Sequence, residues 1–282
     1  MTLPIRNSRL RLSQGQLFWC EIGQGTPIVF LHGAWNDSSQ WATVIQQLGI
    51  QQLGKHRAYR YHCLAPDLLG FGESERPKVH YSVHLQVECL LEWLDALRLA
   101  QVYIVAEGLG AWVATQLALK YPERVQGLVL LAPEGISMPQ AASRWRWARW
   151  LTQPVPIAYW LLQAIAPLAK LMKRSGPAGL LQQRKIWRRS PVACQLLFQR
   201  RHAEIRAEQV QTQLPWLTVP VRLLQFEGDR SIGTALTQAY AAALQVPVTL
   251  LPGDETLLLD SPESITTQIE TFIDSGRDRQ AA

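Results

Sequence analysis

Apolar and polar positions along the chain predict two kinds of element that alternate. Short runs of β-branched and aromatic residues bounded by turn residues predict strands, and longer segments with apolar residues at helical spacing predict helices. The expected strands are residues 17–22, 28–31, 61–65, 102–106, 127–132, 219–226 and 246–251, and the expected helices are residues 83–97, 109–121 and 235–244. A last helix is expected to begin at Pro262 with Ser261 as its N-cap.

This alternation predicts a mostly parallel sheet that is covered by helices on both faces. The uninterrupted apolar runs VYIVA and LVLLA are typical of strands that are buried on both sides. The first two strands are joined by the turn-like sequence GQGTP, and we expect them to form an initial antiparallel hairpin. The fold class predicted from the pattern is therefore α/β.

The alternation stops near Pro133 and resumes at Val219, which predicts an insertion. We place a core at residues 1–135 and 207–282 and a helical, basic, Trp-rich lid at residues 136–206. The insertion contains RWRWARW, KLMKR and RKIWRR, and its apolar residues between 157 and 172 recur at helical spacing. Packing of that apolar stripe against the core is the simplest interpretation.

Charge is distributed unevenly between these two parts. The segment 136–206 holds 13 of the 28 Lys and Arg and a single acid, Glu204, for a net charge of +12, whereas the remaining residues have 15 basic and 21 acidic side chains, for −6. Such asymmetry indicates that the insertion meets an anionic surface or partner. Because no RNA- or DNA-binding motif accompanies the basic residues, the sequence argues against nucleic acid as that partner.

Other sequence features exclude several classes of protein. The first residues, MTLPIRNSRLRLSQGQ, lack the apolar stretch of a secretory signal, so we expect a cytoplasmic protein. The four cysteines are far apart and form no CxxC or Cys/His cluster, and they are most simply buried free thiols. We therefore expect no metal and no cofactor.

Four stretches in order resemble the α/β-hydrolase superfamily. FLHGAWNDSSQW (residues 30–41) is similar to the HG loop, LAPDLLGFGESERP (64–77) to the PD-x-x-G-x-G-x-S segment, IVAEGLGAWVA (104–114) to the nucleophile elbow, and LKYPERVQGLVLLAP (119–133) to the segment that follows the nucleophile helix. The resemblance spans nearly the whole chain. It implies an α/β-hydrolase fold with an inserted helical lid.

The same resemblance indicates that the catalytic triad is degenerate. Where the family elbow reads G-x-S-x-G, this chain has AEGLG, so Gly108 stands in place of the nucleophilic serine. Asp229 occupies the position of the acid, and Glu255 aligns with the histidine that serves as the base. Glycine tolerates the positive φ of the elbow, so loss of the serine need not harm the fold.

The remaining family positions give the amides of the oxyanion hole, at Ala34 or Trp35 and at Leu109. Glu107 neighbours the elbow, but the resemblance places a carboxylate nucleophile at position 108, so we expect Glu107 to point elsewhere. Since amides alone do not make a hydrolase, we predict a pseudoenzyme that binds a protein partner, a lipid surface or a hydrophobic small molecule. Two alternatives stay open: a hydrolase or lyase with rearranged acid/base chemistry at Asp229 and Glu255, and a purely structural subunit.

The insertion supplies the candidate binding surface. Arginine and tryptophan flanking an apolar amphipathic stretch are typical of a helix that lies at a membrane interface. The residues of this candidate surface are Arg144, Trp145, Arg146, Trp147, Arg149 and Trp150. We therefore predict either peripheral contact with an anionic membrane or docking of a hydrophobic partner.

Overall fold

A computed structural model describes residues 5–49, 52–53, 58–152, 159–160, 163, 176–229, 231–253 and 262–281. The chain divides into two compact units. We call Met1–Ile136 together with Val210–Ala282 the core unit, and Ser137–Gln209 the insert unit.

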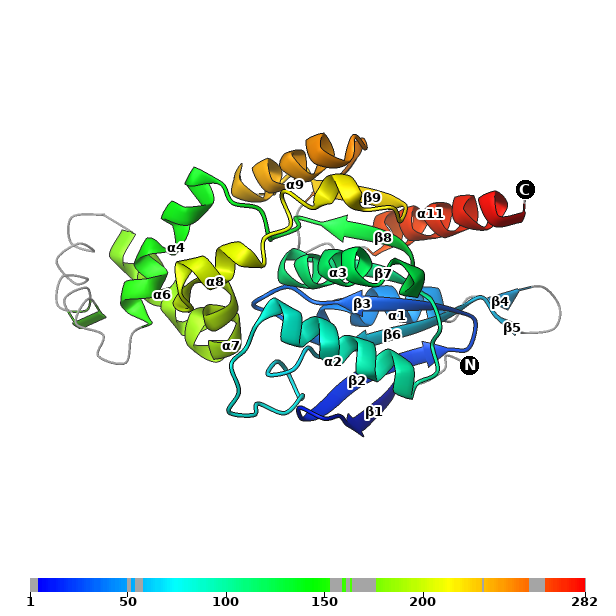
Figure 1. The fold of residues 1–282 in the computed structure, drawn as a ribbon, viewed down its shortest axis with the longest axis horizontal. Coiled ribbons are helices and arrows are strands. Elements are labelled where there is room, and N and C mark those ends of the chain that lie inside the picture. Colours follow the sequence, from blue (N-terminus) through cyan, green and yellow to red (C-terminus); the bar gives the residue numbers. More distant parts are fainter. Residues whose placement is uncertain are drawn as a thin grey trace. The chain divides into compact units, whose positions relative to one another are not determined.

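The core unit is built on an eight-stranded sheet with the strand order β1-β2-β6-β3-β7-β8-β9-β10 (Figure 1). Its strands are β1 Arg6–Arg11, β2 Gln16–Gly23, β3 Thr26–Leu31, β6 Tyr61–Pro66, β7 Val102–Glu107, β8 Val125–Leu131, β9 Val221–Phe226 and β10 Val248–Leu251. From β6 to β10 every pairing is parallel, whereas β1 and β2 are antiparallel to their neighbours. A separate two-stranded ribbon joins β4 Gln52–Leu53 to β5 Ala58–Tyr59.

Helices cover both faces of this sheet. The core unit contains η1 Ser38–Trp41, α1 Ala42–Gly49, α2 Val83–Ala96, α3 Gly108–Lys120, η3 Pro122–Arg124, η5 Leu214–Trp216, α9 Ser231–Leu244 and α11 Glu263–Ala281. One buried cluster joins α1 and α11 to alternate residues of the central strands, such as Phe30 and Val105. Helix α3 packs on β7 and β8 and has α2 beside it, as Figure 1 shows. This arrangement is the α/β-hydrolase fold, in agreement with the sequence.

The expected initial hairpin is wrong. Strands β2 and β3 do not pair with each other, because β6 lies between them, antiparallel to β2 and parallel to β3. The hairpin that does form joins β2 to β1, whose sequence RNSRLR is largely exposed and carries few apolar residues. A strand of this kind gives no hydrophobic signal, so the sequence pattern did not predict it.

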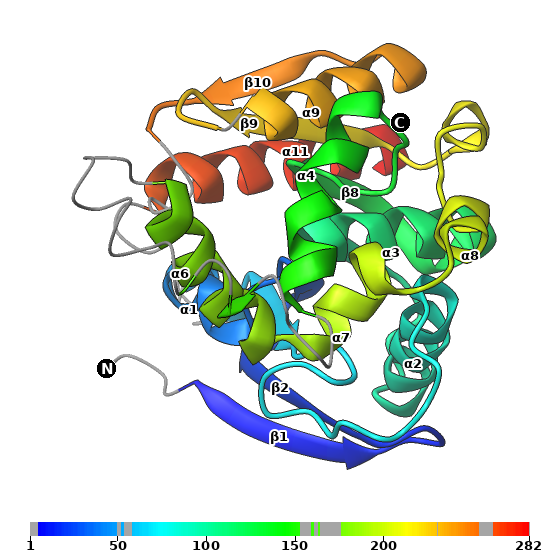
Figure 2. The ribbon, with the colours of Figure 1, turned by 90° about the vertical axis from the view of Figure 1, so that its left-hand side faces the viewer.

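The insert unit is helical in its described parts, which are α4 Pro139–Leu151, α6 Gly176–Arg189, α7 Pro191–Cys194, the π-helix η4 Gln195–Gln199 and α8 His202–Ala207. Figure 2 shows α4 and α6 side by side, and Arg184 joins them by donating from Nε to the Leu151 carbonyl at 2.9 Å. Arg200 and Glu208 form a buried ion pair, with Nη1 2.9 Å from Oε1.

Several expectations fall outside the described residues. The predicted N-cap Ser261 is among them, as is most of the apolar stripe predicted between residues 157 and 172. All four cysteines are free thiols, and three of them are buried as expected, whereas Cys20 is partly exposed.

Candidate functional site

Three segments that resemble the family motifs meet at one edge of the sheet. Gly108 follows β7, the HG loop follows β3, and Asp229 comes shortly after β9. Because β3, β7, β8 and β9 are parallel neighbours, their carboxyl ends lie along the same edge. We call Gly108, its neighbour Leu109 and the facing loop residues Gly33, Ala34 and Trp35 the elbow site.

Gly108 forms the sharp turn from strand to helix. Its φ is +52°, in the left-handed region that favours glycine. A Cβ added to Gly108 would lie 3.8 Å from Gly33 Cα, and among the described residues it would meet no other atom within 4 Å outside its own helix and its chain neighbours. Space for a side chain is therefore open at position 108 in this part of the structure.

Gly110 lies in a very different environment only two residues later. A Cβ on Gly110 would lie 2.6 Å from the His32 carbonyl oxygen and 2.7 Å from that of Leu31. The first turn of α3 therefore approaches the end of β3 so closely that only glycine fits at position 110. This close approach holds the elbow against the HG loop.

Glu107, the residue before the elbow glycine, supports the HG loop through Gln40. The Gly33 N–H donates to Gln40 Oε1 at 3.0 Å, and Gln40 Nε2 donates in turn to Glu107 Oε2. The Glu107 carboxylate thus points toward the HG loop, where a Cβ added to Gly33 would lie 3.4 Å from Glu107 Oε2. The role of Gln40 could not be inferred from sequence, because one polar residue within SSQW gives no sign of a tertiary partner.

His32 has a structural role. Its ring is fully buried, Nδ1 lies 2.8 Å from the Gly33 carbonyl oxygen, and the Leu68 N–H donates to Nε2 at 3.1 Å. Since Nε2 accepts, Nδ1 carries the hydrogen and the imidazole is neutral; burial also lowers the pKa of His32. Both ring nitrogens are occupied by backbone groups, so His32 is not available as a base.

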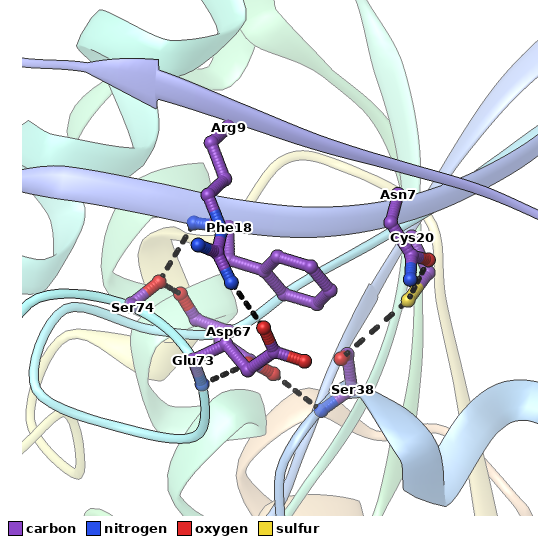
Figure 3. A network of polar contacts seen from close by, with 8 residues as sticks. All are labelled: Asn7, Arg9, Phe18, Cys20, Ser38, Asp67, Glu73 and Ser74. Atoms are coloured by element: carbon purple, nitrogen blue, oxygen red, sulfur yellow. Dashed lines mark hydrogen bonds and ion pairs between the residues drawn. The ribbon is translucent and has the colours of Figure 1, made fainter.

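Asp67 ties the HG loop to the neighbouring segment, as Figure 3 shows. Its buried carboxylate accepts from the Ser38 N–H at 2.6 Å and from the Glu73 N–H at 2.7 Å. Ser74 completes the network by donating to the Asp67 carbonyl at 2.7 Å and accepting from the Phe18 N–H at 2.9 Å. The PD-x-x-G-x-G-x-S segment therefore fixes the loop geometry around the elbow, a role that the motif alone did not reveal.

The triad and amide positions can be placed only in part. The partly buried Asp229 carboxylate accepts from the Phe226 N–H at 3.2 Å at the end of β9, and Glu255 lies outside the described residues. Leu109 is fully buried in the first turn of α3, and Ala34 is buried in the loop after β3. The first N–H groups of a helix have no partner inside that helix, which makes Leu109 a suitable donor to an oxygen at the elbow site.

The basic and aromatic residues of α4 differ in their exposure. Trp145 stacks on Phe198 with ring centroids 5.1 Å apart, while Trp147 and Trp150 are exposed. Arg146 is exposed and Arg149 is partly buried. The side chain of Arg144, which belongs to the same predicted surface, is not among those described.

The described residues contain neither a candidate metal site nor a helix that could span a membrane. No three His, Cys, Asp or Glu side chains in these ranges are grouped closely enough to hold a metal ion. Of the helices that the structure describes, none combines the length and the apolar character needed to cross a membrane.

Comparison with known sequences agrees with the fold. The family model described as "Alpha/beta hydrolase family" matches residues 28–266. The chain belongs to the alpha/beta hydrolase family. It is 37% identical over 118 residues to 2-hydroxymuconate semialdehyde hydrolase of Pseudomonas sp. strain CF600, a match that covers 42% of this chain and 40% of that protein.

A second relative matches over a longer part of the chain. The 1-acylglycerol-3-phosphate O-acyltransferase ABHD5 of Mus musculus is 33% identical over 187 residues, which is 61% of this chain and 48% of that protein. These matches span less than half the length of either relative.

Solved structures of the family have the same architecture. A thermophilic esterase from Thermogutta terrifontis superimposes with a TM-score of 0.67 and 21% identity, covering 96% of this chain and 99% of the esterase. The haloalkane dehalogenase DatA from Agrobacterium tumefaciens gives a TM-score of 0.69 and 22% identity, covering 96% of this chain and 97% of the dehalogenase. At such identities the likeness establishes the fold alone.

Proposed function

We propose that this chain is a non-catalytic member of its family that binds an apolar ligand through a carbonyl or carboxylate oxygen at the elbow site. The observation that carries the proposal is Gly108. It has the positive φ of a nucleophile elbow and open space beside it, but no side-chain atom that can attack.

Loss of hydrolysis follows from the groups that remain. Acyl transfer needs an activated nucleophile and a base within hydrogen-bond reach. Position 108 offers no hydroxyl or thiol, and His32 has both ring nitrogens engaged by backbone groups. In serine proteases, a site stripped of its triad retains only about 10³ to 10⁴ over the reaction in water. Such a residual rate does not constitute a useful hydrolase.

Retention of binding is supported by the contacts that keep the elbow site in shape. Gly110 holds the start of α3 against β3, and the hydrogen-bonded chain from Glu107 through Gln40 to Gly33 holds the HG loop. The Gln40 side chain is buried and so is committed to holding this loop opposite Gly108. The Leu109 N–H, in the first turn of α3, suits a ligand oxygen because helix N-termini carry partial positive charge.

The ligand class is also supported by the names of the relatives. One is named a semialdehyde hydrolase and the other an O-acyltransferase, and a semialdehyde and an acyl group each contain a carbonyl oxygen. A ligand that keeps the carbonyl or carboxylate oxygen and an apolar body would use the same site without being cleaved. The alternative chemistry at Asp229 and Glu255 stays a prediction, because Glu255 lies outside the described residues.

The first test is covalent labelling with a fluorophosphonate, alongside turnover of p-nitrophenyl butyrate. The native chain should show neither labelling nor turnover. The double variant Gly108→Ser with Glu255→His should become labelled, since it restores both missing groups, whereas Gly108→Ser alone should react far more slowly. Labelling of the native chain at any serine or cysteine would refute the non-catalytic assignment.

The second test measures binding of dansyl-labelled undecanoic acid by fluorescence. The native chain should bind it and Gly108→Leu should not, because a leucine side chain fills the open space over the elbow. Gly179→Leu is the matched control, since among the described residues nothing lies within 4 Å of a Cβ added to that glycine of the insert unit. Equal binding by native chain and Gly108→Leu would overturn the assignment of the ligand to the elbow site.

A further inference from the structure

Helix α4 of the insert unit has two faces of different composition. At about 100° per residue, Ala148 and Leu151 lie on one side of the helix, and both are fully buried. Trp147 and Trp150 point away from Ala148, at about 100° and 160° from it around the helix axis, with exposed fractions of 47% and 63%. Trp147 and Trp150 therefore face solvent, three residues apart and about 60° from each other around the axis.

Internal packing does not account for this pair of tryptophans. The neighbouring Trp145 stacks on Phe198 and Trp187 of α6 is 93% buried, whereas Trp160 of the same unit is exposed at 60%. Trp147 and Trp150 instead resemble the aromatic residues of membrane-surface helices, whose rings lie at the depth of the lipid headgroups. An indole suits that position because its ring is apolar and its N–H reaches a polar partner.

The charge of the insert unit identifies the surface that such a face would meet. Residues 137–209 contain 13 Lys and Arg but only two acids, Glu204 and Glu208. Glu208 is buried and bound to Arg200, so it cannot neutralise the cations at the surface. On the exposed face itself, Arg146 lies within about 40° of Trp150 around the helix axis and is exposed.

We propose that the insert unit docks on an anionic lipid bilayer, with Trp147 and Trp150 inserted at headgroup depth and the surrounding arginines and lysines facing lipid phosphates. Each cation near such a surface contributes to attraction that falls off within a Debye length. The proposal concerns the insert unit only. Its failure would leave the function proposed for the elbow site standing.

The test is flotation of the full-length protein with vesicles of phosphatidylcholine alone or mixed with phosphatidylglycerol. The protein should float with the mixed vesicles and far less with the neutral ones, and added salt should release it. Trp147→Gln with Trp150→Gln should weaken binding by about tenfold or more, because it removes the apolar anchor. Arg146→Gln with Arg149→Gln should weaken it roughly fivefold for each arginine at low salt.

Trp216→Gln is the matched control, since Trp216 belongs to the core unit and is 74% exposed. That variant should float like the native protein, and near-ultraviolet circular dichroism should show that every variant is folded. Equal binding to neutral vesicles, unchanged flotation of the Trp147 and Trp150 variant, or equal loss in the Trp216 variant would each overturn the proposal. Stronger retention on polyglutamate beads than on mixed vesicles would also overturn it, in favour of an acidic protein partner.

Discussion

Alanine substitutions at Gly108 and Gly110 should have unequal costs, although the two glycines are only two residues apart. At Gly108 the added methyl group meets only ordinary contact, with Gly33 Cα 3.8 Å away. The cost is therefore mainly the backbone strain of an L-residue in the left-handed region, about 1–2 kcal/mol. For a chain of this size we expect the midpoint of thermal unfolding to fall by a few degrees.

At Gly110 the same methyl group would lie 2.6 Å from one backbone oxygen and 2.7 Å from another. Neither oxygen can move without displacing the end of β3, which lies inside the central sheet. We expect Gly110→Ala to cost about 3 kcal/mol or more, the upper part of the range for overpacking.

Thermal unfolding followed by far-ultraviolet circular dichroism compares the two variants directly. Gly108→Asn adds an internal check, because asparagine tolerates the left-handed region better than alanine and should cost less. If Gly108→Ala were as destabilising as Gly110→Ala, position 108 would not be open. The proposed binding site would then lose its main support.

One buried ion pair and one buried carboxylate give the remaining predictions. Glu208→Gln leaves the Arg200 guanidinium buried with no ionised partner, so the free energy of unfolding measured in urea should fall by about 3 kcal/mol. Replacing both residues by apolar ones should lower it much less. Equal losses in the two variants would contradict this reasoning. Burial raises the pKa of Glu21, but hydrogen bonds from His62 and Arg6 lower it from 4.5 to about 2. Because the pKa of Glu21 is depressed in the folded state, the difference in stability between the native chain and Glu21→Gln should be full above about pH 4.5 and disappear as the pH falls to about 2. A difference that stays constant over that range would show that ionisation of Glu21 contributes nothing to stability.

The parallel part of the sheet was predictable because its signal is local. Strands β7 and β8 are buried on both faces, so their sequences are uninterrupted apolar runs. The helices α2 and α3 begin and end within one residue of the predicted bounds. For these elements, burial and sequence pattern carry the same information.

The antiparallel edge was not predictable, because pairing depends on residues far away in sequence. Nothing within β2 or β3 indicates that β6 will lie between them. The polar sequence of β1 conceals a strand that is held by pairing and by ion pairs such as Arg6 with Glu21. A short turn between two strands is therefore weak support for a hairpin.

At the candidate site, the sequence identified the positions but not the contacts that hold them. Gly108 was found because a motif with one residue replaced is still recognisable as a motif. The roles of Gln40 and Asp67 depend on hydrogen bonds to residues at least 29 positions away, at Glu107 and Ser38 respectively. Such partners become apparent only when the fold brings them together.

The order in which the chain is synthesised has a consequence for how the sheet is completed. Strand β8 pairs with β9, but the whole insert unit is encoded between them. During translation β8 therefore waits with an unpaired edge while the insertion emerges from the ribosome. A message truncated within the insertion would leave that apolar edge open permanently, and we expect such fragments to associate with one another and to depend on chaperones.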